Sequence, residues 1–457
     1  MVSPENPSEP QDDGSDDEFQ RLLKQLLSGD SEGLAKAAGL PIDQNAIASI
    51  IASIQQAAST PPGQVDWSQA RERAQQVAHA SEVVLTDDDR TRASNAFDIA
   101  RLWLSEATAF EPVSAGRVMS RTEWARETLP FWQRLCEPVA GSVAEALLEA
   151  LRGNLPEEMR ASLGQAVQVM RAMATTVFVV QLGQVVGQLA AETVSANEIG
   201  IPAMPNNEPA LLPQNIHDFS QGLEVPVEEI TIFLATRELA HVALFRHAPW
   251  LTSELTSAIT SYARGIQIDV SRIESLGGEI DPSDLDSLRG AVQRGELIPP
   301  RTDDQTAALA RIELLLALIE GWVDTVTGTA VRRLPKGAAI AEAVTRRRAI
   351  GGPAEHAFGT LIGLEFRPRQ LRKAAALWMR VTDSLGSADR DAIWQHPDLL
   401  PTIDELDAPE AFVSRARGDE QSDFDRDLAR LLEGDLPDSP EPNDSDEGSE
   451  GDAPQRG

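Results

Sequence analysis

The residues best suited to chemistry lie in the segment Arg237-Glu238-Leu239-Ala240-His241. It fits the pattern His-Glu-x-x-His at every position but the first. In that pattern two histidines one helical turn apart bind Zn²⁺, and the glutamate acts as general base on the metal-bound water. Glu238 would be the base and His241 a metal ligand, but Arg237 stands at the first histidine position. So short a pattern also arises by chance, and His241 would then be a hydrogen-bonded histidine of an ordinary helix.

A second candidate segment is Leu318-Ile319-Glu320-Gly321-Trp322-Val323-Asp324. In one class of such zinc sites a glutamate from a later helix is the third ligand, and Glu320 could fill that role. Asp324 lies four residues on, so the two carboxylates share a helix face and one could orient the other. The apolar residues just before Glu320 predict that it is buried, and a buried carboxylate needs a partner. The alternative is an exposed acid pair on an amphipathic helix.

Four separated stretches occur in an order that resembles one known family. They read TRELAHVALFRHAPWL, LIEGWVDTVTGTA, RRRAIGGPAEHAFGTLIGLEFRPRQLRKAAALW and IWQHPDLLP. They are similar to an actinobacterial zincin-like family whose members are named zinc-dependent metalloproteases or hydrolases. The resemblance covers nearly all of residues 19–415. It implies a helical zincin-like fold, zinc as the cofactor, an active-site helix at 226–247 and Glu320 at the third-ligand position.

One branch of this family has the motifs HExxH and EGHA. Here Arg237 replaces the first histidine and Trp322 replaces the histidine of EGHA, so the chain looks like the other branch, with RExAH and EGW. A hydrolytic zinc site needs three protein ligands and one open position. His241 and Glu320 are only two, and an arginine cannot be a ligand because it stays protonated. We therefore predict that Arg237 replaces the metal, pairing bidentately with Glu320 or Glu238 and keeping the site neutral.

Another histidine could in principle complete a metal site. His247 follows His241 by six residues, which is about 240° around a helix, so it faces elsewhere unless the helix ends first. His217 lies in a proline-rich stretch that could fold back over the helix. His79 is expected at the surface, and the remaining two are expected to form structural hydrogen bonds; these are His356 and His396.

Two functions of different class remain open. The first is a zinc-dependent metalloprotease or hydrolase, with Glu238 as base, His241 and Glu320 as metal ligands and a third ligand missing. The second is a catalytically inactive pseudo-protease that binds no metal and holds a peptide or protein in the former cleft. The residue at position 237 discriminates between the two functions. An arginine there cannot be a metal ligand, which favours the inactive pseudo-protease.

The elements that must position these residues are helical. Apolar residues recur at helical spacing along most of the chain, so the fold class is mainly α. We expect one large helical domain over 19–434 that includes helices at 226–247 and 303–329 and basic helices over 337–385. A small hairpin or extended edge is expected in the proline-rich stretch 198–224. Gly183 and Gly187, in a long apolar helix, would let another helix approach closely.

The formal charge of −32 is unevenly distributed. The first twenty residues hold seven acids and no base, and residues 433–457 hold nine acids and one base. Their composition predicts disordered acidic tails at 1–18 and 435–457. The single cysteine, Cys136, excludes a disulfide scaffold. No signal peptide or membrane span is expected, and the predicted location is the cytoplasm.

A basic stretch interrupts this acidity. Residues 331–380 hold eleven bases against three acids. This stretch could dock an acidic partner, the protein's own tails, or nucleic acid. Nucleic acid is not expected as a partner, because few aromatic residues are interleaved for base stacking.

Overall fold

The computed structural model describes residues 65–111, 113, 116–153, 164–265, 301–353, 359 and 368–418. These residues are mainly helical, which confirms the predicted fold class. The first helices are α4 (Ser68–His79), α5 (Asp87–Leu104), α6 (Arg121–Gly153), α8 (Gly164–Glu192), α9 (Pro213–Ser220), α10 (Val227–His247) and α11 (Pro249–Arg264). The later ones are α14 (Asp303–Ala330), α15 (Gly337–Ala349), α17 (Pro368–Leu385), α18 (Ser387–Ala392), α19 (Ile403–Asp407) and α20 (Pro409–Arg417). Short 3-10 turns are η1 (Pro205–Asn207), η2 (Val331–Arg333), η3 (Ile393–Gln395) and η4 (Pro397–Leu399).

Several predictions fall outside the described residues. They concern both acidic tails, the ends of the predicted domain at 19 and 434, and His356. Among the residues described, no helix is long and apolar enough to cross a membrane. The one-domain organisation over 19–434 stays a prediction.

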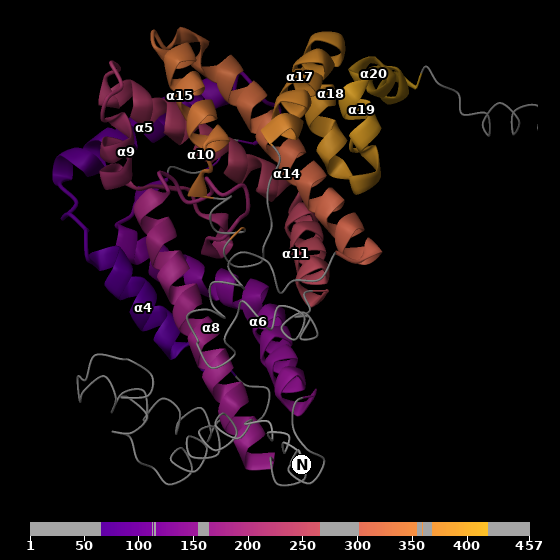
Figure 1. Ribbon diagram of the computed structural model, residues 1–457. Coiled ribbons are helices and arrows are strands. Elements are labelled where there is room, and N and C mark those ends of the chain that lie inside the picture. Colours follow the sequence, from indigo (N-terminus) through magenta and orange to yellow (C-terminus); the bar gives the residue numbers. More distant parts are fainter. Residues whose placement is uncertain are drawn as a thin grey trace, which may run out of the picture.

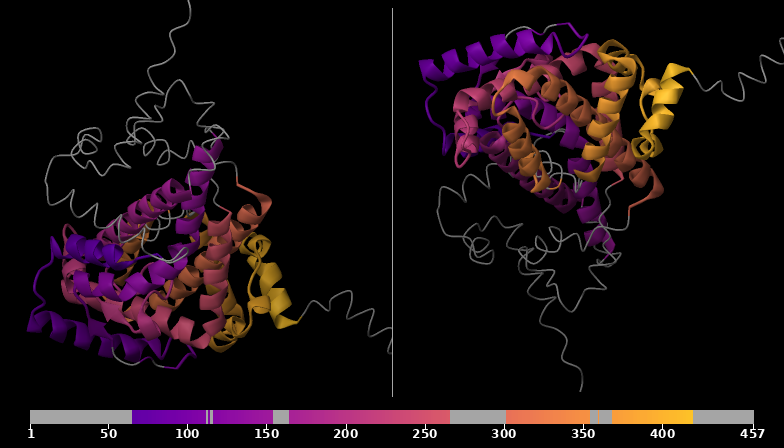
Figure 2. Two further views of the ribbon diagram at one scale, coloured as in Figure 1. Left: turned by 90° about the horizontal axis from the view of Figure 1, so that it is seen from below. Right: turned by 90° about the horizontal axis from the view of Figure 1, so that it is seen from above.

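Helix α10 lies at the centre of the molecule, where α5, α9, α11, α14 and α15 contact it (Figure 1). Every residue from Phe233 to Phe245 is buried, so α10 has no solvent face over this length. A helix that is apolar around most of its circumference must lie in the core. The N-terminal helices (indigo) and α17–α20 (yellow) lie on opposite sides of the molecule in both views of Figure 2. The candidate site residues on α10 and α14 are therefore held by core packing.

Helices α4, α6 and α8 pack against one another on one side. The glycines of α8 face α4, as predicted: a Cβ atom on Gly183 would lie 2.9 Å from Cα of Ala70, and one on Gly187 would lie 2.8 Å from the carbonyl oxygen of Ala74. Atoms that close would collide, so the two glycines permit the contact between α4 and α8.

One helix boundary predicted from the sequence is wrong. A pair of helices separated at Pro138 is expected, but α6 runs unbroken from Arg121 to Gly153. A proline inside a helix costs about 3 kcal/mol, because it removes one hydrogen bond and crowds the preceding turn. The packing of α6 against α4, α8 and α11 outweighs this cost.

The extended segment before α10 is present but is not a hairpin. Strand β2 (Ala210–Leu211) lies in the proline-rich stretch, and it pairs in parallel with β1 (Arg117–Val118), which precedes α6. On its other side β2 meets residues 193–204, which we call the strap: Ser195 forms an antiparallel bridge with Leu211. The proline-rich stretch also contains α9, which begins at Pro213 in a favoured first helical position.

Six of the eleven bases in the basic stretch form ion pairs with acids of this chain. The pairs are Arg333 with Glu106, Arg346 with Glu342, Arg347 with Glu198, Arg348 with Glu320, Lys373 with Asp407 and Arg380 with Glu410. The expectation that nucleic acid is not a partner stays a prediction.

Candidate functional site

Helices α10 and α14 bring the two candidate segments together. Arg237 Nη2 donates to Glu320 Oε2 at 2.8 Å, and His241 Nε2 lies 2.9 Å from Glu320 Oε1. Arg237 Nη1 forms a second ion pair, with Asp324. The predicted pairing of Arg237 with Glu320 is thus present. Its form differs from the prediction, since the guanidinium divides between two carboxylates and does not bind one of them bidentately.

An arginine that sequence reasoning missed completes the group. Arg348, at the end of α15, donates through Nη2 to Glu320 Oε2, and its Nη1 lies 3.7 Å from Asp324 Oδ1. We call Arg237, His241, Glu320, Asp324 and Arg348 the ion-pair cluster. The sequence did contain a signal, because Arg346–Arg348 is a run of three bases. Nothing in the sequence indicates which of the three points inward.

The charges of the cluster fix its protonation. Burial alone would raise the pKa of the Glu320 carboxyl, but neighbouring positive charges, Arg348 first among them, hold that pKa well below its usual value. The charge of Glu320 in turn raises the pKa of Arg348 against the effect of burial. Glu320 is therefore ionised and Arg348 is charged at neutral pH.

His241 is bonded at both ring nitrogens. Nδ1 lies 3.1 Å from the carbonyl oxygen of Arg237, and Nε2 faces the ionised Glu320. Both partners are hydrogen-bond acceptors, so each ring nitrogen has a partner within this chain. A metal ligand needs a ring nitrogen that faces the metal with its lone pair. Nε2 of His241 faces Glu320 instead.

Glu238 is completely buried, but its partners are not members of the cluster. Its Oε1 accepts from Asn197 Nδ2 at 2.8 Å and from the backbone N–H of Ala210 at 3.1 Å, and its Oε2 accepts from the backbone N–H of Asn197 at 3.0 Å. Burial raises the pKa of Glu238, and hydrogen bonds from Ser195 and Asn197 oppose the rise. The strap and β2 thus donate hydrogen bonds to the carboxylate that would act as base.

Trp322 is buried, and the hydrogen bond of its side chain is to a residue outside the ion-pair cluster. Its Nε1 donates to Asp391 Oδ1 at 2.9 Å, and the Arg390 guanidinium lies 5.7 Å from the centre of its ring. The neighbouring Gly321 permits close packing, since a Cβ there would lie 2.7 Å from the backbone nitrogen of Ala375 on α17. Trp322 therefore joins α14 to α18.

The other histidines that the structure describes do not complete a metal site. His217 is exposed and lies 3.1 Å from the amide nitrogen of Gln221, and His247 stacks on Phe110 with ring centres 4.1 Å apart. His79 is exposed beside Glu82, as expected. His396 accepts from the N–H of Asp398 at 3.3 Å, in the structural role predicted for it.

The donor set of the cluster does not fit Zn²⁺. Two guanidinium groups lie at the carboxylates of the cluster and would repel a divalent cation, and the oxygens of Glu320 already bind Arg237, His241 and Arg348. In the described ranges no group of three or more His, Cys, Asp or Glu could hold a metal ion.

Comparisons with known proteins relate this fold and site to others. Residues 65–413 match the family described as zincin-like metallopeptidase. Among solved structures, a candidate hydrolase with a novel fold from Chloroflexus aurantiacus is similar, with a TM-score of 0.54 and 19% sequence identity over 79% of this chain and 100% of that one. At this identity the likeness concerns the fold alone. The search of curated proteins found no match. Because the family match spans most of the sequence, the chain belongs to the zincin-like metallopeptidase family.

Proposed function

We propose that this protein is a catalytically inactive zincin-like relative that holds no zinc and acts as a peptide- or protein-binding module. The observation that supports this most directly is the carboxylate of Glu320. In place of a metal it binds the guanidinium groups of Arg237 and Arg348 and the ring of His241. The proposal includes membership of the branch with RExAH and EGW motifs.

The electrostatics of the cluster support the absence of zinc. Arginine is not deprotonated in proteins, so Arg237 and Arg348 stay charged whatever the pH of the cell. For Zn²⁺ to bind to Glu320, this carboxylate would have to leave both arginines. Arg237 and Arg348 would then each lose a carboxylate partner while buried or partly buried, which is costly.

The surroundings of Glu238 support the loss of catalysis. A general base must come within hydrogen-bond reach of the proton that it removes. Both oxygens of Glu238 are instead bound by N–H groups of Asn197 and Ala210. The binding role rests on family membership, since a peptidase-like fold that has lost its chemistry keeps a shape suited to peptides.

A second candidate is a zinc-dependent peptidase or hydrolase. Family membership favours it, as does the spacing of Glu238 and His241 opposite Glu320 on a neighbouring helix. It would use Glu238 as base and His241 and Glu320 as metal ligands, after Arg237 and Arg348 had moved away. A cytoplasmic location belongs to both candidates and stays a prediction from the sequence.

Elemental analysis of the purified full-length protein tests the two candidates. We expect far less than one zinc per chain, both in the wild type and in Glu320→Ala. About one zinc per chain in the wild type that disappears in Glu320→Ala would contradict the proposal and support the peptidase.

A further inference from the structure

The ion-pair cluster and Glu238 are shielded from solvent. The exposed fraction is 0% for Glu238, 1% for His241 and 6% for Glu320. A partner that uses this site can reach it only if some part of the protein moves. The described contacts point to two covering parts, which are the strap and the C-terminal end of α15.

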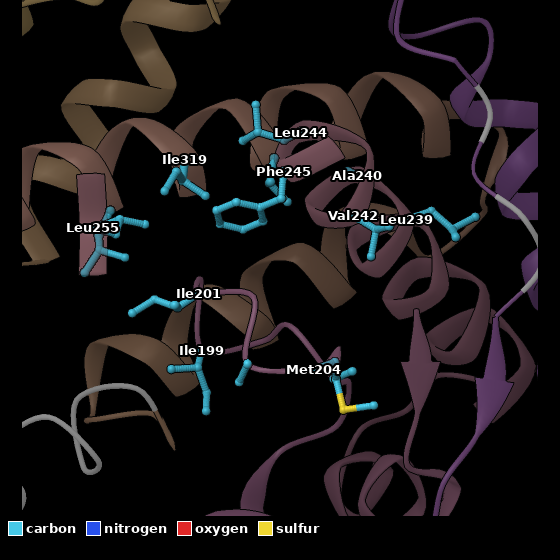
Figure 3. Close-up of a cluster of buried hydrophobic side chains, with 14 of the residues drawn as sticks. Ile199, Ile201, Met204, Leu239, Ala240, Val242, Leu244, Phe245, Leu255 and Ile319 are labelled. Atoms are coloured by element: carbon cyan, nitrogen blue, oxygen red, sulfur yellow. The ribbon is translucent and has the colours of Figure 1, made fainter. Parts of the chain in front are cut away.

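The strap contacts both buried glutamates. Asn197 binds Glu238 through its backbone and its side chain. Gly200 has a φ of +79°, and a Cβ atom there would lie 2.9 Å from Glu320 Oε1, so the backbone passes directly over this carboxylate. Figure 3 shows Ile199, Ile201 and Met204 of the strap beside the apolar side chains of α10.

Within the described part of the chain, few backbone hydrogen bonds join the strap to its neighbours, although its apolar side chains are buried in the core. Ala196 N–H donates to Ala210 O of β2 at 2.9 Å, and the N–H of Leu212, the residue after β2, donates to Val194 O at 3.0 Å. The position of the strap therefore depends mainly on contacts that involve side chains of α10 and α15.

Two adjacent arginines of α15 connect the strap to the cluster. Arg347 Nη1 lies 3.2 Å from Glu198 Oε1 on the strap, and its Nη2 binds the carbonyl oxygen of Glu192, where the strap begins. Glu198 also accepts from the N–H of Val194 at 2.6 Å. Arg348, the next residue, binds Glu320 and so holds the cluster. The C-terminal end of α15 therefore contacts both the strap and the ion-pair cluster.

We propose that the strap is a movable cover over the ion-pair cluster and that Arg347 and Arg348 form its latch. Displacement of the end of α15 releases Glu198 of the strap from Arg347 and Glu320 of the cluster from Arg348 together. Access to the site is then controlled by a few partly buried ion pairs on a single helix. This inference rests on the proposed function only in taking the cluster as the place where a partner enters.

Hydrogen exchange of the full-length protein, measured by mass spectrometry, tests the latch. The variants are Arg347→Gln, Arg348→Gln and Glu198→Gln, and Glu198→Gln keeps an oxygen for the N–H of Val194. The matched control is Arg346→Gln, because among the described residues its ion pair is with the exposed Glu342 of its own helix. We expect amides of the strap to exchange at least about tenfold faster in the three variants than in the control. Exchange in α11 should stay unchanged.

Two outcomes would overturn the inference. Equal exchange of the strap in all variants would show that the arginines do not hold it. Faster exchange in Arg347→Gln and Glu198→Gln but not in Arg348→Gln would show that the strap and the cluster open independently. If Arg348→Gln raises exchange throughout the chain, Arg347→Gln and Glu198→Gln still test the latch. These two variants remove the same ion pair, so their effects on exchange of the strap should not add in the double variant. Exchange does not depend on zinc content, so this result is distinct from the elemental analysis.

Discussion

Arg237 on α10 and Glu320 on α14 form a buried ion pair at 2.8 Å, at the place where the zincin-like pattern would have a metal between its ligands. An arginine and a divalent cation both neutralise a buried carboxylate, but they leave different chemistry. A metal keeps an open position for water, whereas a guanidinium can only donate hydrogen bonds. In the proposed function, Arg237 therefore holds the two helices together without providing an open position for water.

Removal of Glu320 should destabilise the protein more than removal of Arg237. Glu320→Ala leaves Asp324 as the one carboxylate of the cluster for Arg237 and Arg348, and we expect a loss of about 3–5 kcal/mol in the free energy of unfolding. Arg237→Ala should cost less, because Arg348 and His241 still bind Glu320. Urea titration followed by circular dichroism measures both. The opposite order would show that Glu320 is not the centre of the cluster.

The stabilising effect of Glu320 should depend on pH. Its pKa in the folded state is held below its ordinary value of 4.5, so the ion pairs contribute fully above that pH. The contribution is lost as the pH falls below 4.5 towards the folded-state value. The difference in unfolding free energy between wild type and Glu320→Gln should be largest near about pH 7 and smaller near about pH 3. Glu342→Gln, which removes an exposed acid, is the control.

Restoring the first histidine should not by itself restore a metal site. In Arg237→His, Glu320 still binds Arg348, and that charge still repels a cation. We expect zinc in the double variant Arg237→His/Arg348→Gln and much less in either single variant. Elemental analysis after dialysis against zinc gives the stoichiometry. One zinc per chain in Arg237→His alone would mean that Arg348 does not matter to the site.

The glycines of α8 should tolerate no side chain. Gly183→Ala would place a methyl group against the backbone of Ala70 and is expected to lower stability by about 1–3 kcal/mol. Gly328 of α14 is the matched control, since a Cβ there meets nothing within 4 Å. Gly328→Ala should raise stability by about 0.5–1 kcal/mol, because alanine favours the helix. Thermal unfolding of the two variants should therefore shift in opposite directions.

Cys136 should be unreactive while the protein is folded. The thiol is buried, and burial raises its pKa to about 12. The reactive thiolate is then scarce at neutral pH. Iodoacetamide should modify Cys136 only after denaturant is added, as mass spectrometry of the intact protein can show. Rapid modification without denaturant would mean that the core around α6 opens easily.

Much of the fold follows from local patterns. Apolar periodicity predicts α10, α14 and α17 nearly to their ends, because an amphipathic or apolar helix must bury its face. Glycines in α8 predict a close helix contact, since only glycine lets backbones approach so far. The unbroken α6 could not be predicted, because the cost of its proline is local whereas the compensating contacts come from other helices.

For the site, the sequence by itself determined that Arg237 and His241 share one helix face, that Glu320 and Asp324 share another, and that a buried carboxylate would need a positive partner. Only the tertiary structure decided that Arg348 joins them and that Asn197 binds Glu238, 41 residues away. It also decided that Trp322 turns to Asp391, 69 residues away. Spacing along a helix is fixed by its geometry. Contacts between distant segments depend on how all the helices pack, which no local pattern specifies.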